Sequence, residues 1–171
     1  MHGNAGRFPS SRVAFALGAC VLAGSACQFT PVEDAPPAET QVVSRIEHIV
    51  PEGVARLPVF TPAVRVGDLV FLSGAIGTPA SGEFRVVDGG VGAETRAAME
   101  NLGRVLEAAG LGFEDLVKCT VFLTDIADFD AMNAVYITFF DGIEPPARSA
   151  MAGSGLALNA RIEVECIAAT R

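Results

Sequence analysis

Apolar and polar residues alternate in several short segments of this chain, and two longer segments repeat apolar residues every three or four positions. The alternating segments carry many β-branched residues and predict strands at 42–50, 117–123, 147–152 and 160–169. Residues 63–73 predict a hairpin, because the pair Gly67-Asp68 divides two apolar runs.

The two periodic segments predict helices over residues 94–109 and 128–140. Gly110 suits the left-handed residue that ends the first helix, and Asp128 suits the N-cap of the second. The stretch between the hairpin and the first helix is rich in turn residues, and its glycines at 88–92 are interpreted as a turn. This order of elements predicts an α+β fold, a mixed sheet with two helices packed on one face.

The first 41 residues have a different composition. Residues 1–12 contain two arginines and no acid, and residues 13–26 are apolar or small throughout, as in an export signal. We expect a signal peptide or lipoprotein signal at 1–27, a disordered linker at 28–41 and a folded domain at 42–171, and therefore an exported protein, periplasmic or anchored to a membrane.

Two cysteines are candidates for lipidation. Leu17-Gly18-Ala19-Cys20 looks like the lipobox of bacterial lipoproteins, and Cys27 follows a longer apolar run. Cleavage after Ala26 without lipidation and a buried amino-terminal helix are the alternatives.

Composition narrows the possible functions. With 171 residues and 50% apolar residues, the chain suits one folded domain. The formal charge is −8, and residues 28–171 alone carry −10, because the first 27 residues hold two arginines and no acid. Lys118 is the only lysine, so nucleic acid is not an expected partner.

Familiar catalytic and metal-binding motifs are missing from the sequence. His48 is the only histidine after the expected signal, which argues against a histidine-rich metal site or a Ser-His-Asp triad. Cys119 and Cys166 lie in predicted strands, where buried inert thiols are favoured and a disulfide in an oxidising compartment is the alternative.

One polar set near the end of the chain remains. Arg148 follows the rigid pair Pro145-Pro146, and the alternation in 161–166 places Glu163 and Glu165 on one strand face. Arginine binds a carboxylate through two parallel hydrogen bonds, and a glutamate can deprotonate water. On neighbouring strands the pair favours a small anionic substrate and a hydrolytic water, with a structural ion pair as the alternative.

The body of the chain closely resembles the RidA (YjgF) family from about residue 46 to Ala169. The similar segments, in the family's order, are VRVGDLVFLSG (64–74), ETR (94–96), NL (101–102), VLEAAG (105–110), VKCTVFL (117–123), NAVY (133–136), FF (139–140), PARS (146–149) and IEVECIA (162–168). The resemblance implies a chorismate-mutase-like fold of the Bacillus type and a homotrimer with a ligand pocket in each interface.

The resemblance also implies a reaction. Members of the family hydrolyse reactive 2-imino acids, or their enamine tautomers, to 2-keto acids and ammonia without a cofactor. By motif, Arg148 binds the substrate carboxylate, Glu163 positions the attacking water, and Ser73 and Asn133 join the substrate site.

The chain departs from the family at three positions. Phe60 stands where active members usually have tyrosine, Ala75 where glutamine is usual, and Ala150 where cysteine is frequent. Phe60 and Ala150 are still counted as substrate-binding residues in a less polar pocket. A trimer that only binds a small carboxylate is therefore the alternative function, and a ribonuclease fits the negative charge poorly.

Overall fold

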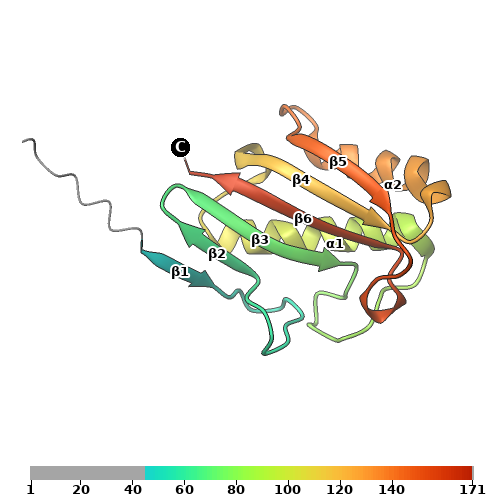
Figure 1. Cartoon of the computed structure of the whole chain (residues 1–171), viewed down its shortest axis with the longest axis horizontal. Coiled ribbons are helices and arrows are strands. Elements are labelled where there is room, and N and C mark those ends of the chain that lie inside the picture. Colours follow the sequence, from blue (N-terminus) through green and yellow to red (C-terminus); the bar gives the residue numbers. More distant parts are fainter. Residues whose placement is uncertain (1–44, 171) are drawn as a thin grey trace, which may run out of the picture. The chain divides into compact units, whose positions relative to one another are not determined.

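A computed structural model describes residues 45–170, in which one mixed sheet has both α-helices on the same face (Figure 1). The elements are β1 (Ile46–Ile49), β2 (Ala63–Val66), β3 (Leu69–Ile76), α1 (Gly90–Ala108), β4 (Leu116–Leu123), α2 (Phe129–Tyr136), β5 (Ala147–Ala152) and β6 (Ile162–Ala169). The six strands lie in the order β1-β2-β3-β6-β4-β5. The pair β4–β5 is parallel and the other pairs are antiparallel, so the predicted mixed sheet with two helices is confirmed.

The predicted hairpin is formed by β2 and β3. Gly67 turns the chain with a φ of 59°, a left-handed value that glycine adopts without steric cost. Strand β2 pairs with β3 only as far as Leu72, whereas β3 continues to Ile76 and pairs there with β6. The second half of β3 therefore has a strand neighbour on one side only, which leaves room beside it.

Helix α1 begins four residues earlier than the apolar pattern predicts. The interpretation of 88–92 as a turn is only partly correct, because Gly89 and Gly90 have positive φ values but the helix already includes Gly90. The first turn, Gly90–Ala93, contains one large apolar residue, Val91, among glycine and alanine, which is too weak an apolar pattern to reveal the helix. The end of α1 is as predicted, with Gly110 left-handed at a φ of 72°.

Asp128 does not act as the predicted N-cap of the second helix. The helical path begins one turn earlier, in the 3₁₀ segment Ile126–Asp128, where the side chain of Asp125 accepts a hydrogen bond from the Ala127 amide. The Asp128 carboxylate instead binds the Arg161 guanidinium through two hydrogen bonds of 2.7 and 2.8 Å. This ion pair joins the start of α2 to the start of β6.

The core lies between the helices and the sheet. It contains Val70, Met99, Leu102, Leu106, Val121, Leu123, Met132, Ile162 and Val164, among other buried residues. Cys119 and Cys166 are part of this core and form a disulfide, so the favoured prediction of free thiols is wrong. They are joined because β4 and β6 pair with these two residues directly opposite each other, a register that the sequence alone does not reveal.

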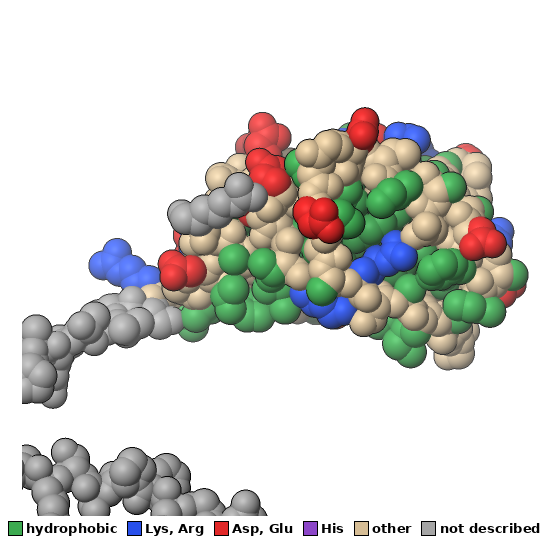
Figure 2. Space-filling view, turned by 90° about the horizontal axis from the view of Figure 1, so that it is seen from above, with side chains coloured by type: hydrophobic (Ala, Val, Ile, Leu, Met, Phe, Trp, Pro, Cys, Tyr) green, Lys and Arg blue, Asp and Glu red, His purple; other side chains and the backbone are tan. Residues whose placement is uncertain are grey.

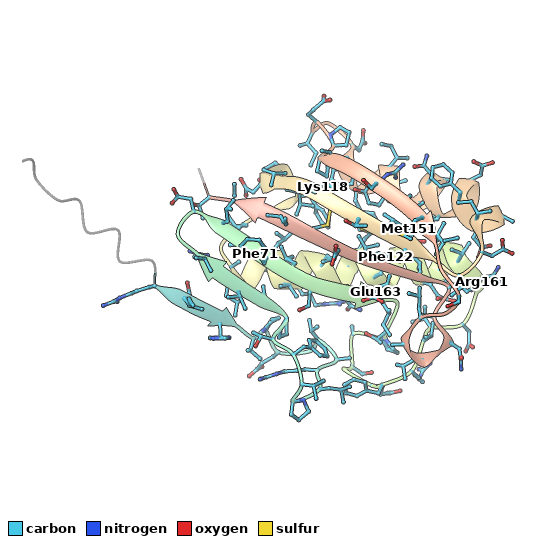
Figure 3. All side chains as sticks on the ribbon, in the orientation of Figure 1. Phe71, Lys118, Phe122, Met151, Arg161 and Glu163 are labelled. Carbon is cyan, nitrogen blue, oxygen red and sulfur yellow. A yellow bond between two sulfur atoms is a disulfide. The ribbon has the colours of Figure 1, made fainter. Side chains whose placement is uncertain are left out.

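The other face of the sheet carries no helix in the described part of the chain. The strand registers place Phe71, Lys118, Phe122 and Met151 on this open face, where Figure 3 shows their side chains. Phe71 and Met151 are 44% and 54% exposed, which is high for large apolar side chains inside strands. In a single chain the open face therefore exposes large apolar side chains next to polar ones such as Thr120, Ser149 and Glu165.

The predictions for the first residues of the chain concern residues outside the described ones. These are the signal at 1–27 with Cys20 and Cys27, the linker at 28–41 and the start of the first predicted strand at 42. Between residues 45 and 170, no helix has the length and hydropathy needed to cross a membrane.

Candidate functional site

Arg148 lies on the edge strand β5, with its side chain toward α2. Its guanidinium carbon is 4.7 Å from the centre of the Tyr136 ring and 5.8 Å from that of Phe129. Such cation–π contacts contribute about 0.5–2 kcal/mol each and restrict where the guanidinium can lie. Within residues 45–170, Arg148 has neither an ion pair nor a hydrogen bond, so its charge is available to a ligand.

Tyr136 supports Arg148 through its ring rather than through its hydroxyl. The Tyr136 hydroxyl is buried and has no hydrogen-bond partner in the described part of the chain. Burial raises the pKa of Tyr136 to about 12, although the charge of Arg148 acts in the opposite direction. The phenol therefore stays neutral, and its ring face is the part that meets the guanidinium.

The edge that carries Arg148 can be followed in two figures. Strand β5 and helix α2 lie at the top of Figure 1, so the view from above in Figure 2 faces this edge. Figure 2 shows basic side chains in the middle of this surface, with apolar side chains next to them. A cation in an apolar surround attracts a small anion more strongly than one in open water.

Glu163 lies near the start of β6, on the open face of the sheet, where Figure 3 labels it. Burial raises the pKa of Glu163, and the negative charge of Glu165 adds to the effect. Within residues 45–170 its carboxylate has no hydrogen bond or ion pair. A half-buried carboxylate with a raised pKa is a better general base than an exposed one.

Gly74 makes room for this carboxylate. At this point β3 changes register against β6, between Leu72 and Ala75. A β-carbon at position 74 would overlap Glu163 Oε1 and lie 2.8 Å from the carboxyl carbon. The carboxylate therefore occupies the space that any side chain at position 74 would fill.

A cavity of about 400 Å³ opens beside Glu163 and the second half of β3. Ser73 and Phe60, both predicted site residues, line it together with Glu163. The Ser73 hydroxyl donates a hydrogen bond of 2.7 Å to the Thr61 carbonyl, which ties β3 to the segment that carries Phe60. The remaining lining is mostly apolar and comes from residues 54–62, the loop after β3, α1 and the 3₁₀ segment Ala157–Asn159.

The predicted site residues form two groups rather than one. Arg148 and Ala150 share the helix face of β5, and Asn133 lies on α2 one turn from both aromatic residues that contact Arg148. Glu163, Ser73 and Phe60 line the cavity.

Arg148 and Glu163 cannot meet within one chain. They are not on neighbouring strands as predicted, because β4 lies between β5 and β6. Arg148 pairs with Cys119 and Glu163 pairs with Phe122, and residues three apart on a strand point to opposite faces. The alternative of a structural ion pair is wrong for the same reason.

Other residues of the site were not among the predicted site residues. Leu158 lines the cavity from the 3₁₀ segment Ala157–Asn159, Phe84 from a segment without regular structure, and Asn101 from α1. No group of three histidine, cysteine, aspartate or glutamate residues that could hold a metal ion is present among the described residues. The described residues thus provide a carboxylate that can act as a base, Glu163 at the cavity, and a guanidinium that can bind an anion, Arg148 on β5.

Comparison with known proteins connects these features to a family. A family model described as "Endoribonuclease L-PSP" matches residues 54–170. A rat protein named 2-iminobutanoate/2-iminopropanoate deaminase is 44% identical over 115 residues, which cover 67% of this chain and 82% of that protein.

Two solved structures from Escherichia coli have the same fold. The yjgF gene product is 34% identical with a TM-score of 0.68, and the match covers 73% of this chain and 99% of that one. TdcF with bound serine is 32% identical with a TM-score of 0.66, and the match covers 71% and 98%. The sheet with its two helices is therefore the chorismate-mutase-like fold, and the chain belongs to the RidA (YjgF) family.

Proposed function

We propose that this protein hydrolyses reactive 2-imino acids, or their enamine tautomers, to 2-keto acids and ammonia without a cofactor. The observation that carries the proposal is the half-buried carboxylate of Glu163 at the wall of a cavity, which has no hydrogen bond or ion pair within residues 45–170. Relatives support it, since the rat protein and an Arabidopsis protein that is 40% identical are named 2-iminobutanoate/2-iminopropanoate deaminase and Reactive Intermediate Deaminase A.

The proposed reaction uses Arg148 to bind the substrate carboxylate through two parallel hydrogen bonds. This binding holds the imine carbon next to a water molecule that Glu163 orients. The water oxygen bonds to that carbon of the protonated imine while Glu163 accepts a water proton, and the electron pair of the C=N bond moves to nitrogen. Glu163 then gives this proton to the amine nitrogen. As the C–N bond breaks and ammonia leaves, the hydroxyl oxygen forms the C=O bond of the keto acid and its proton passes to Glu163, which releases it to the ammonia.

The other site residues have supporting roles in this proposal. The Asn133 amide, beside Arg148, completes the polar surround of the substrate carboxylate. The Ser73 hydroxyl donates to Thr61 and keeps its lone pairs free to accept a hydrogen bond from the substrate nitrogen. Phe60 and Ala150 give apolar contacts where the family more often has polar groups.

We further propose that the active protein is a homotrimer and that each site forms between two copies. Arg148 and Glu163 face opposite sides of one sheet, so a substrate that touches both must lie between chains. The open sheet face offers Leu69, Phe71 and Met151, which are 41–54% exposed, as apolar surface for a second copy. Contacts between two different surfaces of the same chain, here the Arg148 side of one copy and the Glu163 side of the next, form a closed ring when the rotation between copies allows it.

A trimer that binds a small carboxylate without turnover is the second candidate. It is favoured by Phe60 and Ala75, both at the cavity, because the tyrosine and glutamine usual at these places would add polar groups. A ribonuclease activity has less support, because Glu163 is the charged residue at the cavity and the chain carries a formal charge of −8.

Export to an oxidising compartment is also proposed. The positive and apolar segments at residues 1–26 support it. The disulfide Cys119–Cys166 supports it independently, because such bonds persist mainly outside the reducing cytosol.

Replacing Arg148 tests substrate binding. We expect the wild type to accelerate keto-acid release from 2-imino acids that an amino-acid oxidase generates while semicarbazide competes for the imine. Arg148→Ala should lower kcat/KM by about a hundredfold or more, and Arg148→Lys should recover only part of it, because lysine lacks the planar two-pronged donor. Equal rates for folded wild-type and Arg148→Ala protein would contradict the proposed imine hydrolysis.

The pH dependence tests Glu163. Because burial raises the pKa of Glu163, its carboxylate becomes protonated at a higher pH than an ordinary glutamate. Turnover should therefore fall as the pH drops through this raised pKa, and Glu163→Gln should lack that limb and lose about a hundredfold or more in kcat. Dividing the wild-type rate by the Glu163→Gln rate at each pH cancels the effect of the imine's own titration. A constant ratio from acid to neutral pH would exclude Glu163 as the base.

Mixing two inactive variants tests whether the site is shared. When Arg148→Ala and Glu163→Gln are co-expressed, about a quarter of the interfaces in random trimers regain both groups, so about a quarter of the wild-type activity should return. The control pairs Arg148→Ala with the double variant, which restores no site. Activity no higher than that of the separate variants, in trimers verified by light scattering, would place the two groups in independent roles.

Mass spectrometry of the protein from its own cells tests export. We expect either an acylated Cys20 or Cys27 at a new amino terminus, or cleavage after Ala26, together with an oxidised Cys119–Cys166 pair. A protein that retains Met1 and carries free thiols at 119 and 166 would refute export.

A further inference from the structure

The cavity beside Glu163 extends well beyond the catalytic carboxylate. Its volume of about 400 Å³ lies in the range of pockets that enclose drug-sized ligands, roughly 300–1,000 Å³. The two smallest imino acids of the family's reaction have only a methyl or an ethyl side chain. With either bound at Glu163, much of the apolar lining would remain in contact with water.

The lining offers apolar surface in nearly every direction. Its large apolar residues are Val54, Leu57, Phe60, Pro62, Ile76, Phe84, Leu102, Val105 and Leu158. They come from segments far apart in the sequence, so the apolar character is not an accident of one strand or helix. Leu102 and Val105 are buried core residues of α1, which gives the cavity a rigid floor.

The polar groups at the cavity already have partners inside the chain. Asn101 donates hydrogen bonds of 3.0 Å to both the carbonyl and the hydroxyl oxygen of Thr78, and Ser73 donates to Thr61. Glu163 is left as the polar side chain of the lining without a partner in the described part of the chain. A ligand therefore meets one carboxylate without an internal partner and a lining that is otherwise mostly hydrocarbon.

Leu158 closes one side of the cavity in an unusual backbone conformation. Its φ is 55°, and that of Asn159 is 58°, values that residues with a β-carbon rarely adopt. Leu158 is 44% exposed although it lines the cavity, so it lies at the boundary between the cavity and the solvent. Non-glycine residues persist in such conformations where the surrounding structure holds them, and they concentrate at functional sites.

From the cavity and its lining we infer that the enzyme's preferred substrates are 2-imino acids with large apolar side chains, of leucine or phenylalanine size. The side chain fills the cavity while the imine carbon stays at Glu163, and Leu158 covers the far end of the side chain. Leu158 is thus a specificity-determining residue. The inference rests on the proposed imine hydrolysis and names its substrate class.

The test compares imines made in place from alanine, leucine and phenylalanine by an amino-acid oxidase, with semicarbazide as the competing trap. For wild-type full-length protein, kcat/KM for the leucine or phenylalanine imine should exceed that for the alanine imine by about tenfold or more, since each methylene in an apolar pocket contributes on that scale. An equal or higher value for the alanine imine overturns the inference but leaves imine hydrolysis standing. No acceleration of any imine overturns both.

Two variants locate the preference in the cavity. Leu158→Ala should reduce the leucine-to-alanine ratio of kcat/KM about fivefold or more. The matched control is Ile46→Ala, which truncates an apolar residue that is 65% exposed on the edge strand β1, away from the cavity lining, and should leave the ratio unchanged. Equal ratios in both variants and the wild type would overturn the role of Leu158.

Binding of the products gives a readout that does not depend on turnover. In calorimetry with Glu163→Gln protein, 4-methyl-2-oxopentanoate should bind about tenfold or more tightly than pyruvate, because both keep the carboxylate and differ in the side chain. Equal affinities would contradict the occupation of the cavity by the side chain.

Discussion

Side chains along a strand point alternately to the two faces of a sheet, and this alternation decides where the two charged groups of this protein can act. Arg148 aligns with Cys119 and Glu163 with Phe122, so the guanidinium faces the helices and the carboxylate faces the open side. Within residues 45–170 neither group has a hydrogen bond or an ion pair, so each remains available for chemistry. The proposed shared site and the proposed trimer both follow from this geometry.

Much of the fold could be predicted from the sequence because apolar residues repeat with different periods in its strands and its helices. The hairpin around Gly67, the end of α1 at Gly110 and the last three strands lie close to their predicted places. The start of α1 was missed because small residues carry no apolar period, and Asp128 was misassigned because its carboxylate binds Arg161, far away in the sequence. Periodicity reports on local structure, whereas strand register and ion pairs are long-range.

The candidate site was predictable only in part for the same reason. Motifs identified Arg148, Glu163, Ser73 and Phe60, and the last three do line one cavity. Arg148 lies away from these three residues because β4 lies between β5 and β6, and no local sequence pattern predicts that strand order. The disulfide has the same origin, because it depends on a register between strands rather than on cysteine spacing. Leu158 could not be predicted as a site residue, because no sequence pattern indicates that a leucine will adopt a left-handed backbone conformation.

Gly74 places a limit on how this protein can change through evolution. Its missing side chain is the space that the Glu163 carboxylate occupies, so even alanine there would push the carboxylate out of position. In a library covering every single substitution, position 74 should therefore rank with the reacting groups under selection for turnover, while Gly153, which has open space around it and no positive φ, should tolerate more exchange. In a descendant that used a catalytic base at another position, residue 74 could carry a side chain. Glycine at position 74 is therefore required only as long as Glu163 is the base.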